Sequence, residues 1–476
     1  MSDRNSLETR SRETPLQKTG LWILALTGSL LGGLATIGFS SFNSPLTMVV
    51  LIIIFLGTIF LSTGLDLIND RFDAFEIKNV FLLFYGLNSL SVPIRCLFDQ
   101  TGPEEFRVVL KGFALCLAGL LSFIVGYSFR SAAPASRPIP LIPSQWSPQK
   151  TKWIARVYIV GGFAVFLAVL AFTSGIRQYF TAGYGGRALL KSKLGPLELG
   201  LYISLIGILL YYSYFLIARR RPSLLFWGSV SGFILLMSLI GIRRPTFWIL
   251  LGAMAIYHYL GRRISFMKAV LAVLVLGGGL IVFAFTRHIV SEGDFFGGLN
   301  YARDNFSWSW FDISRTELGA PFNSLTQILK KVPESTPYFY GSSYLETPLI
   351  LLPRVLYPNR PDSISGWYER TFFSEDFVAE GGSMGVFIVA EAYVNFGDVG
   401  VIVIMFLWGF FFKKLYEVFK RHKSFPPYVF LYAISLAWII FLMRLDFAGA
   451  LKGYLVTALL PAIPAIYLAK RKAERG

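Results

Sequence analysis

The stretch from Thr19 to Leu65 reads TGLWILALTGSLLGGLATIGFSSFNSPLTMVVLIIIFLGTIFLSTGL and contains no charged residue in 47 positions. A helix that crosses a bilayer needs about 20 mostly apolar residues. The stretch is therefore long enough for two membrane-spanning helices, with a turn near Ser44-Pro45. This segment alone predicts a membrane protein and not a soluble domain.

Similar apolar runs follow along the rest of the chain. Ten of them are candidate membrane spans, namely 79–94, 112–129, 157–176, 199–218, 222–242, 245–261, 269–286, 399–412, 424–443 and 453–469. Run 79–94 contains Asn88 and Pro93, and run 399–412 is short unless its helix begins before Asp398. With the first stretch, these runs predict an all-α polytopic membrane protein with about twelve transmembrane helices.

The overall composition agrees with this interpretation. Of the 476 residues, 54% are hydrophobic and 15% are charged, whereas an average soluble domain has about 25% charged residues. A cytosolic enzyme is therefore excluded. The chain has only two cysteines, so neither a disulfide framework nor a thiolate metal site is expected.

Lysine and arginine are distributed unevenly between the predicted loops. If the N-terminus is cytoplasmic, the inside segments carry 25 of the 45 Lys and Arg residues, with clusters at 219–221, 413–414 and 470–472. Short cytoplasmic loops of membrane proteins carry such an excess. We therefore expect both termini to be cytoplasmic.

One predicted outer loop is much longer than the others. It covers 287–396 and separates an N-terminal membrane region of nine helices, 1–286, from a C-terminal region of three helices, 397–476. Loops of this length are usually functional or disordered, and the many aromatic residues here favour order. The loop has 8 basic and 13 acidic residues, so nucleic acid is not an expected partner. Within it, Pro321 to Val332 predicts a short helix on the membrane face.

Several arginines lie on the predicted outer side. Arg243 and Arg244 precede Pro245 at the start of a helix, and two guanidinium groups there would form an anion site. The alternative is that both side chains only reach the lipid headgroups. Arg177 and Arg187, in the loop after the fifth span, could hold a ligand or anchor that loop at the interface.

The large loop offers further candidates. Arg287 follows a span directly, and Arg354 and Arg360 stand among prolines that hold the backbone extended and fix where the side chains point. A rigid surface loop with solvated arginines is the alternative. Glu391 lies within a turn or two of the membrane, where ionisable groups are functional candidates.

Near arginines, the Glu391 carboxylate would stay ionised and could deprotonate a hydroxyl group. Glu380 is the second candidate for this role of base. The alternative for Glu391 is a charge at a helix N-terminus that the helix dipole favours. No nucleotide-binding or metal-binding motif is present, so no cofactor is expected.

Two local stretches resemble the O-antigen and exopolysaccharide repeat-unit polymerases, the Wzy-type family, whose architecture the whole chain also resembles. These stretches are Gly341-x-Ser343-Tyr344 with Pro353-Arg354-x-Leu-Tyr-Pro358-x-Arg360-Pro361, and Glu391-Ala-Tyr393-x-Asn395-Phe396-Gly397-x-x-Gly400. The family also shows an arginine followed eleven positions later by glycine in its outer loops, which Arg287 with Gly298 and Arg370 with Gly381 match.

The resemblance implies a fold similar to the GT-C-like polymerases and ligases. It implies a metal-independent glycosyltransferase in the bacterial inner membrane, which joins oligosaccharide repeat units carried on polyprenyl diphosphate at the outer leaflet. A chain-length regulator and a flippase would be partners. We expect Glu391, Arg354, Arg243 and Arg244 to be catalytic. Expected substrate contacts are Arg177, Arg187, Arg287, Tyr344, Arg360, Arg370, Glu380, Tyr393 and Asn395.

Two other classes of protein stay open. An O-antigen ligase shares the twelve-helix plan and the large outer loop, but transfers the finished glycan to another acceptor. A polysaccharide or lipid transporter usually shows two similar halves with charged or broken helices at the membrane centre. No such similarity between halves is found in this sequence.

Overall fold

The computed structural model describes residues 44–99, 101–129, 142–173, 195–240, 244–291, 295–307, 318–354, 356–379 and 384–471. The ordered elements within these ranges are helices, and the only β-type pairing there is a single bridge between Trp146 and Lys470. The predicted all-α class is therefore confirmed for the described part of the chain.

Seven helical segments of the described residues are long and apolar enough to cross a membrane. They are α2 (Pro45–Ile68), α3 (Ile77–Phe98), α4 (Pro103–Ser128), α5 (Pro148–Thr173), α8 (Gly195–Ile217), α18 (Ile388–His422) and the continuous segment Phe447–Leu468. That last segment is made of α20 (Phe447–Gly453), η4 (Tyr454–Leu459) and α21 (Leu460–Leu468). The chain is thus a multi-pass α-helical membrane protein.

Further apolar helices lie between these segments. They are α9 (Leu224–Ile240), α10 (Arg244–Ile256) with its π-helical continuation η1 (Tyr257–Gly261), α11 (Phe266–Ser291) and α19 (Pro426–Leu442). Every predicted span from the second onward coincides with a helix, and the first lies outside the described residues. The total of twelve spans and their orientation remain predictions.

The predicted turn at Ser44-Pro45 coincides with the start of α2. Ser44 is the N-cap, and its Oγ accepts a hydrogen bond from the Thr47 amide at 3.3 Å. Pro45 occupies the first helical turn, where its missing N–H costs nothing. Prolines start α4 and α19 in the same way.

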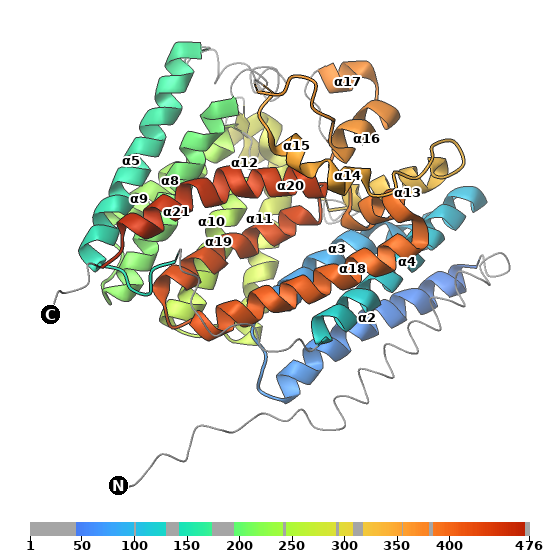
Figure 1. Cartoon of the computed structure of the whole chain (residues 1–476), viewed down its shortest axis with the longest axis horizontal. Coiled ribbons are helices and arrows are strands. Elements are labelled where there is room, and N and C mark those ends of the chain that lie inside the picture. Colours follow the sequence, from blue (N-terminus) through green and yellow to red (C-terminus); the bar gives the residue numbers. More distant parts are fainter. Residues whose placement is uncertain are drawn as a thin grey trace, which may run out of the picture.

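The helices form two groups that α19 bridges (Figure 1). One group contains α2, α3, α4 and α18, and the other contains α5, α8, α9 and α10. Helices α4 and α18 approach so closely that a Cβ at Gly126 would lie 2.1 Å from the Phe406 carbonyl oxygen. Gly409 meets the Phe123 carbonyl in the same way, so small residues bring these two backbones into contact.

Helix α18 is broken near its start. Gly397 has φ 66° and ψ −154°, which divides the helix into a short leg, 388–396, and a long leg, 398–422. The predicted run 399–412 is therefore part of a longer helix, and the kink coincides with the predicted end of the large loop. Glu391, Tyr393 and Asn395 belong to the short leg.

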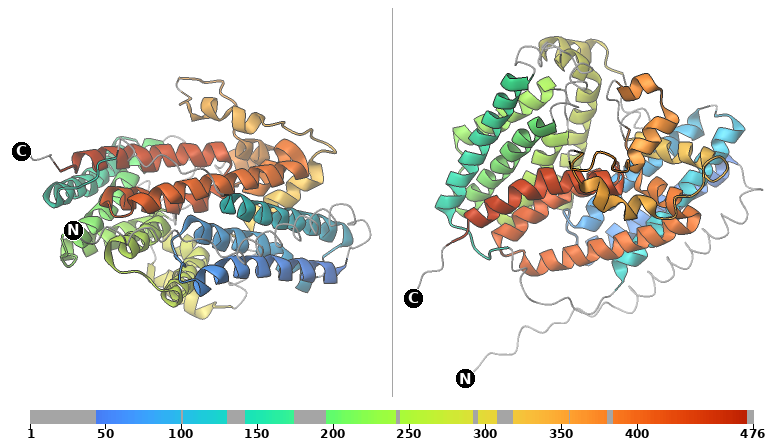
Figure 2. Two further views of the ribbon diagram at one scale, coloured as in Figure 1. Left: turned by 60° about the horizontal axis from the view of Figure 1, so that its bottom comes forward. Right: turned by 45° about the horizontal axis from the view of Figure 1, so that its top comes forward.

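The described part of the large loop folds into short helices. They are α12 (Phe295–Asp304), α13 (Ala320–Lys331), α14 (Ser342–Leu345), α15 (Thr347–Leu351), α16 (Ile364–Phe372) and α17 (Glu375–Ala379). Helices α13 to α17 lie together beside α20 and the start of α18 (Figures 1 and 2). We call this end of the bundle the loop end, and the end with the α2–α3, α8–α9 and α18–α19 turns the turn end.

Helix α13 confirms the predicted helix at Pro321 to Val332, but not its expected place on the membrane face. Its apolar side is buried against α3, α4 and α18. A Cβ at Gly112 of α4 would lie 3.4 Å from the Phe322 ring and 3.5 Å from Leu325. The apolar side of α13 is therefore part of the protein core, because α3, α4 and α18 cover it.

Candidate functional site

The two stretches that carry the family resemblance lie against each other at the loop end. The amides of Phe339 and Tyr340 donate to the carbonyls of Val394 and Asn395, both at 2.9 Å. The Gly341 amide donates to the Asn395 side-chain oxygen at 3.1 Å. We call this contact between residues 338–347 and 391–397 the clasp.

Two glycines with positive φ make the clasp possible. Gly341 has φ 90°, and a Cβ there would lie 2.8 Å from the Phe396 ring. Gly397 has φ 66°, and a Cβ there would lie 3.1 Å from the Tyr338 hydroxyl. Both positions need a residue without a side chain, since side chains strain such backbone conformations and the space is occupied.

Glu391 is the centre of the clasp. Its side chain is almost completely buried, with 2% exposure. Oε1 accepts a hydrogen bond from the Ser343 hydroxyl at 3.2 Å, and Oε2 accepts one from the Phe447 amide at 2.7 Å. The Asn395 amide group donates to the Ser343 hydroxyl at 2.8 Å. Glu391 thus connects the short leg of α18 to α14 and to the start of α20.

The surroundings of Glu391 differ from those expected from the sequence. None of the described arginines forms an ion pair with it, and the charged side chain that acts on it is another carboxylate, Asp446. Asp446 is the buried N-cap of α20 and accepts hydrogen bonds from the Ser365 hydroxyl and the Gly449 amide. The arginines gather elsewhere at the loop end.

A group of cations lies beside the clasp. Arg354 and Arg370 both contact Asp362, with Nη2 to carboxylate distances of 3.1 Å and 2.6 Å. Arg360 donates to the Leu352 carbonyl at 3.0 Å and to the Ile350 carbonyl, which also accepts from Lys452 Nζ at 3.2 Å. We call Arg354, Arg360, Arg370 and Lys452 the cation cluster.

The cation cluster carries an excess of positive charge that is open to solvent. Two of its four cations, Arg354 and Arg370, contact one carboxylate, Asp362, and their side chains are 65% and 54% exposed. Burial and then the neighbouring Arg354 lower the pKa of Arg360, while Asp362 opposes this shift. Arginine has five N–H donors in a planar fork that suits phosphate. The cluster can therefore bind an anion at low cost.

Tyr344 forms an aromatic patch between the clasp and α20. Its ring is stacked on Phe396 with 6.5 Å between centroids and lies 5.8 Å from Phe447. Burial, and then the Glu391 carboxylate, raises the pKa of Tyr344 well above its ordinary value. The Tyr344 hydroxyl therefore stays protonated and neutral.

Tyr393 and Asn395 were expected to contact substrate, but both are buried in the described structure. Tyr393 donates from its hydroxyl to the Val332 carbonyl at 3.2 Å, on the side of α13. Asn395 uses its side chain within the clasp. In this arrangement neither residue has a free surface for a ligand, so both position the clasp.

The other predicted site residues are distributed as follows. Arg244 starts α10 at the loop end, and its guanidinium lies 5.0 Å from the centre of the Phe441 ring. Arg287 belongs to α11, but its side chain is not described. Four predicted residues lie outside the described residues, namely Arg177, Arg187, Arg243 and Glu380.

Sequence reasoning missed two members of this region. Lys452 directly precedes the apolar run 453–469, where a lysine is ordinarily read as a headgroup contact. Asp362 follows Pro361 at the end of the proline-rich stretch. Its position two residues after Arg360 could have indicated that it pairs with a nearby arginine. Within the described ranges, no three His, Cys, Asp or Glu side chains are close enough to hold a metal ion.

Comparison with known proteins identifies one match. A family model described as a domain of unknown function, DUF8712, matches residues 302–437. This segment contains α13 to α18 and most of α19. It also contains both segments of the clasp and three of the four cations of the cluster. No curated protein and no solved structure matches the chain.

Proposed function

We propose that the protein is a membrane glycosyltransferase that polymerises oligosaccharide repeat units linked to polyprenyl diphosphate, at the outer leaflet of a bacterial cytoplasmic membrane. The observation that carries this proposal is the cation cluster, which the clasp holds at the end of a bundle of apolar helices. The stretches that resemble the Wzy-type polymerases form the clasp and supply Arg354 and Arg360 of the cluster.

The chemistry of the reaction explains why cations are needed. When the glycan leaves its carrier, negative charge develops on the oxygens of the departing diphosphate. Arginines that are fixed before the reaction stabilise such charge strongly. Arg354 and Arg370 are held by a single carboxylate, Asp362. An incoming diphosphate would therefore compete with only one anion for their donors.

The acceptor sugar hydroxyl needs a base. Glu391 was the first candidate, but both of its oxygens already accept hydrogen bonds and its side chain is buried. In this arrangement Glu391 is a positioning residue, because it holds the start of the helix that carries Lys452. Glu380, the second carboxylate considered from the sequence, becomes the candidate base of this proposal.

The proposal is tested with purified protein and lipid-linked repeat units, whose products separate as a ladder on a gel. Replacing both Arg354 and Arg370 by Ala should reduce ladder formation by about 10²- to 10³-fold, the loss expected when donors to a developing charge are removed. Helix content and yield should not change, because both side chains are exposed.

A matched control exists in the same loop. Arg303 pairs with Asp304 at 2.8 Å and is 74% exposed, so Arg303→Ala removes an equivalent ion pair outside the cluster. It should leave the ladder intact. A normal ladder from the Arg354→Ala, Arg370→Ala double variant would contradict the proposal. In cells, single capped repeats indicate a lost polymerase, whereas unattached long chains indicate a lost ligase.

A further inference from the structure

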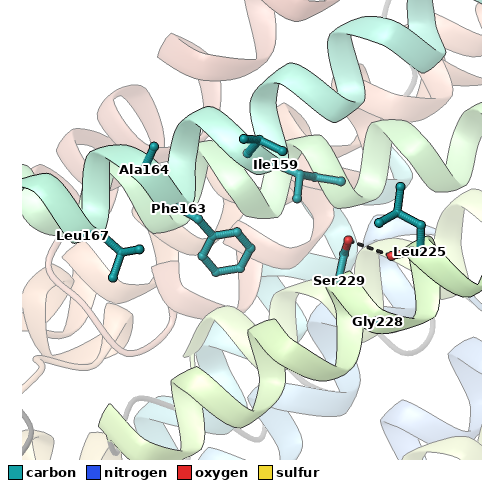
Figure 3. Close-up of a pocket in the computed structure, with 8 residues that line it drawn as sticks. Ile159, Phe163, Ala164, Leu167, Leu225, Gly228 and Ser229 are labelled. Atoms are coloured by element: carbon teal, nitrogen blue, oxygen red, sulfur yellow. Dashed lines mark hydrogen bonds between the residues drawn. The ribbon is translucent and has the colours of Figure 1, made fainter.

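An apolar groove runs between α5 and α9 (Figure 3). Its volume is about 510 Å³, and Val160, Phe163 and Leu167 line it from α5, with Leu225 and Gly228 from α9. Val160 and Leu225 are 68% and 58% exposed. Ser229 also lines the groove, but its hydroxyl donates to the Leu225 carbonyl at 2.8 Å (Figure 3). The groove therefore suits a hydrocarbon chain.

The end of the groove nearest the turn end is basic. Arg156 precedes Val160 by four residues, so both lie on the same face of α5. Arg219, Arg220 and Arg221 form the α8–α9 turn, four to six residues before Leu225, and all three are exposed. The four arginines thus lie next to the apolar lining in sequence, one on α5 and three just before α9.

Contacts of Tyr211 bring Arg156 close to the start of α9, which follows the arginine turn. Arg156 donates from Nε and Nη2 to the Tyr211 hydroxyl of α8 at 3.3 Å and 3.2 Å. The Tyr211 ring lies 6.0 Å from Phe226, at the start of α9 and close in sequence to the arginine turn. Lys152 adds another cation, with Nζ 5.9 Å from the centre of the Tyr214 ring.

The surrounding charges are of one sign. Helices α5 and α9 contain no acidic residue, and the acidic residue of α8, Glu198, lies 13 positions from Tyr211. At 1.5 Å per residue, this separation is about 20 Å along the helix. Arg156 uses two of its five N–H donors on Tyr211, so others are left for an anion.

We propose that this groove binds one anionic phospholipid, with an acyl chain between α5 and α9 and the phosphate on Arg156 and the Arg219–Arg221 turn. An apolar channel that ends in several cations complements both parts of such a lipid. Basic pockets between transmembrane helices bind anionic headgroups for this reason. The site lies at the turn end and is independent of the proposed function.

The test uses the purified full-length protein in detergent, with dioleoylphosphatidylglycerol and dioleoylphosphatidylcholine as probes that have the same acyl chains. Native mass spectrometry counts bound lipid, and thermal unfolding reports stabilisation. The phosphatidylglycerol should bind at least about tenfold more tightly, since each cation near an anionic headgroup contributes about fivefold. Equal binding of the two lipids would overturn the proposal.

Charge variants locate the headgroup. Replacing Arg219, Arg220 and Arg221 by Gln should remove the preference for phosphatidylglycerol, and Arg156→Gln should weaken binding about fivefold. The matched control replaces Lys414, Lys420 and Lys423 by Gln, which removes the same charge from the α18–α19 region of the turn end. This control should keep the preference. Loss of preference in the control alone would place the headgroup elsewhere and reject the site.

A groove variant locates the acyl chain. A Cβ at Gly228 meets no atom of the described residues within 4 Å, so Gly228→Leu fills the groove without a clash and should abolish retained lipid. Gly57→Leu, at an equally open position on α2, is the control. Unchanged binding in Gly228→Leu contradicts the proposal. So does a dimer of the wild-type protein that Gly228→Leu dissociates, because a second copy would then occupy the groove. If the Gly228→Leu protein cannot be produced, the Arg219–Arg221 and Arg156 variants still test whether the groove binds an anionic lipid.

Discussion

Carboxylates tie the helices together at both ends of the bundle, but the two sites differ in what lies next to them. At the loop end, Glu391 joins α18 to α14 and α20. At the turn end, Asp73 accepts hydrogen bonds from the hydroxyls of Tyr259 and Tyr416 at 2.8 Å and 2.9 Å. It also accepts from the Phe75 amide, and His258 Nε2 lies 3.3 Å away.

The donors around Asp73 come from three separate parts of the chain. Phe75 precedes α3, His258 and Tyr259 belong to the π-helix η1, and Tyr416 belongs to α18. Two neighbours in sequence ordinarily point about 100° apart on an α-helix. The local π-helix brings His258 and Tyr259 to the same carboxylate.

The difference between the two sites supports our proposal that the binding surface lies at the loop end. The contacts of Asp73 are with neutral hydroxyls, an amide and a histidine. They join the segment before α3 to η1 and α18 at the turn end. Beside the clasp, by contrast, lie exposed arginines that share a single carboxylate, Asp362. A carboxylate therefore fixes the backbone at each end, and at the loop end that backbone also carries the cation cluster, in which two exposed arginines share Asp362.

The sharpest test of this comparison replaces Glu391. Glu391→Ala leaves the Phe447 amide and the Ser343 hydroxyl without their acceptor, at a cost of about 1–3 kcal/mol for each group. The start of α20 should shift together with Lys452, and ladder formation should be lost. Glu391→Gln keeps an oxygen for Phe447 and an amide for Ser343, so it should retain most of both the thermal stability and the ladder.

The two variants separate positioning from acid–base chemistry. If Glu391 were the base, Glu391→Gln would unfold at the wild-type temperature but form no ladder. That result would contradict the positioning role and restore Glu391 as the first candidate for the base.

Asp73→Ala should reduce stability without a direct effect on activity. It removes the acceptor for Tyr259, Tyr416 and the Phe75 amide, so we expect a loss of about 3 kcal/mol. Thermal unfolding in detergent measures this loss, and ladder formation per folded molecule should be unchanged. The control is Asp99→Ala, an exposed carboxylate that pairs with Arg95 and should cost less than about 0.5 kcal/mol. A normal unfolding temperature with a lost ladder would reverse the assignment of the two ends.

Gly397→Ala should disturb the clasp through the backbone. Its φ of 66° with ψ of −154° lies in a region that is essentially limited to glycine. Strain there and contact with the Tyr338 hydroxyl should cost about 2 kcal/mol, and the short leg of α18 should lose its register with residues 339–341. Gly57→Ala, in an open helical position, should instead stabilise by about 0.5–1 kcal/mol. A Gly397→Ala protein of wild-type stability with a normal ladder would show that the kink is not required.

Much of the fold was predictable, because the thickness of the bilayer sets the length of each helix. Even the run 79–94, with Asn88 and Pro93, is part of the 22-residue helix α3. The run 399–412 was too short on its own because its helix starts before a glycine kink, which no apolar run reveals. The side on which α13 packs depends on helices far away in sequence, and this explains the wrong expectation.

The candidate site was predictable only in part. The stretches around Gly341 and Glu391 could be selected from the sequence, because both carry the family resemblance and Glu391 lies within a turn or two of an apolar run. Their contact could not be foreseen, because it depends on one side-chain oxygen of Asn395 reaching the Gly341 amide. One of the two partners of Glu391 is the backbone amide of Phe447, and a contact with a backbone amide cannot be read from residue types.

Single hydroxyls at the turn end should give the smallest effect. Tyr416→Phe removes one of the two hydroxyls on Asp73 Oδ2, and Tyr259 continues to donate to the same oxygen. We therefore expect a loss of about 1 kcal/mol, with no change in the ladder. Tyr259→Phe should behave alike. The double variant should lose more than the sum of the two, because the oxygen then has neither hydroxyl. Strict additivity would mean that the two hydroxyls contribute independently, and Asp73 would then not be the centre that couples them at the turn end.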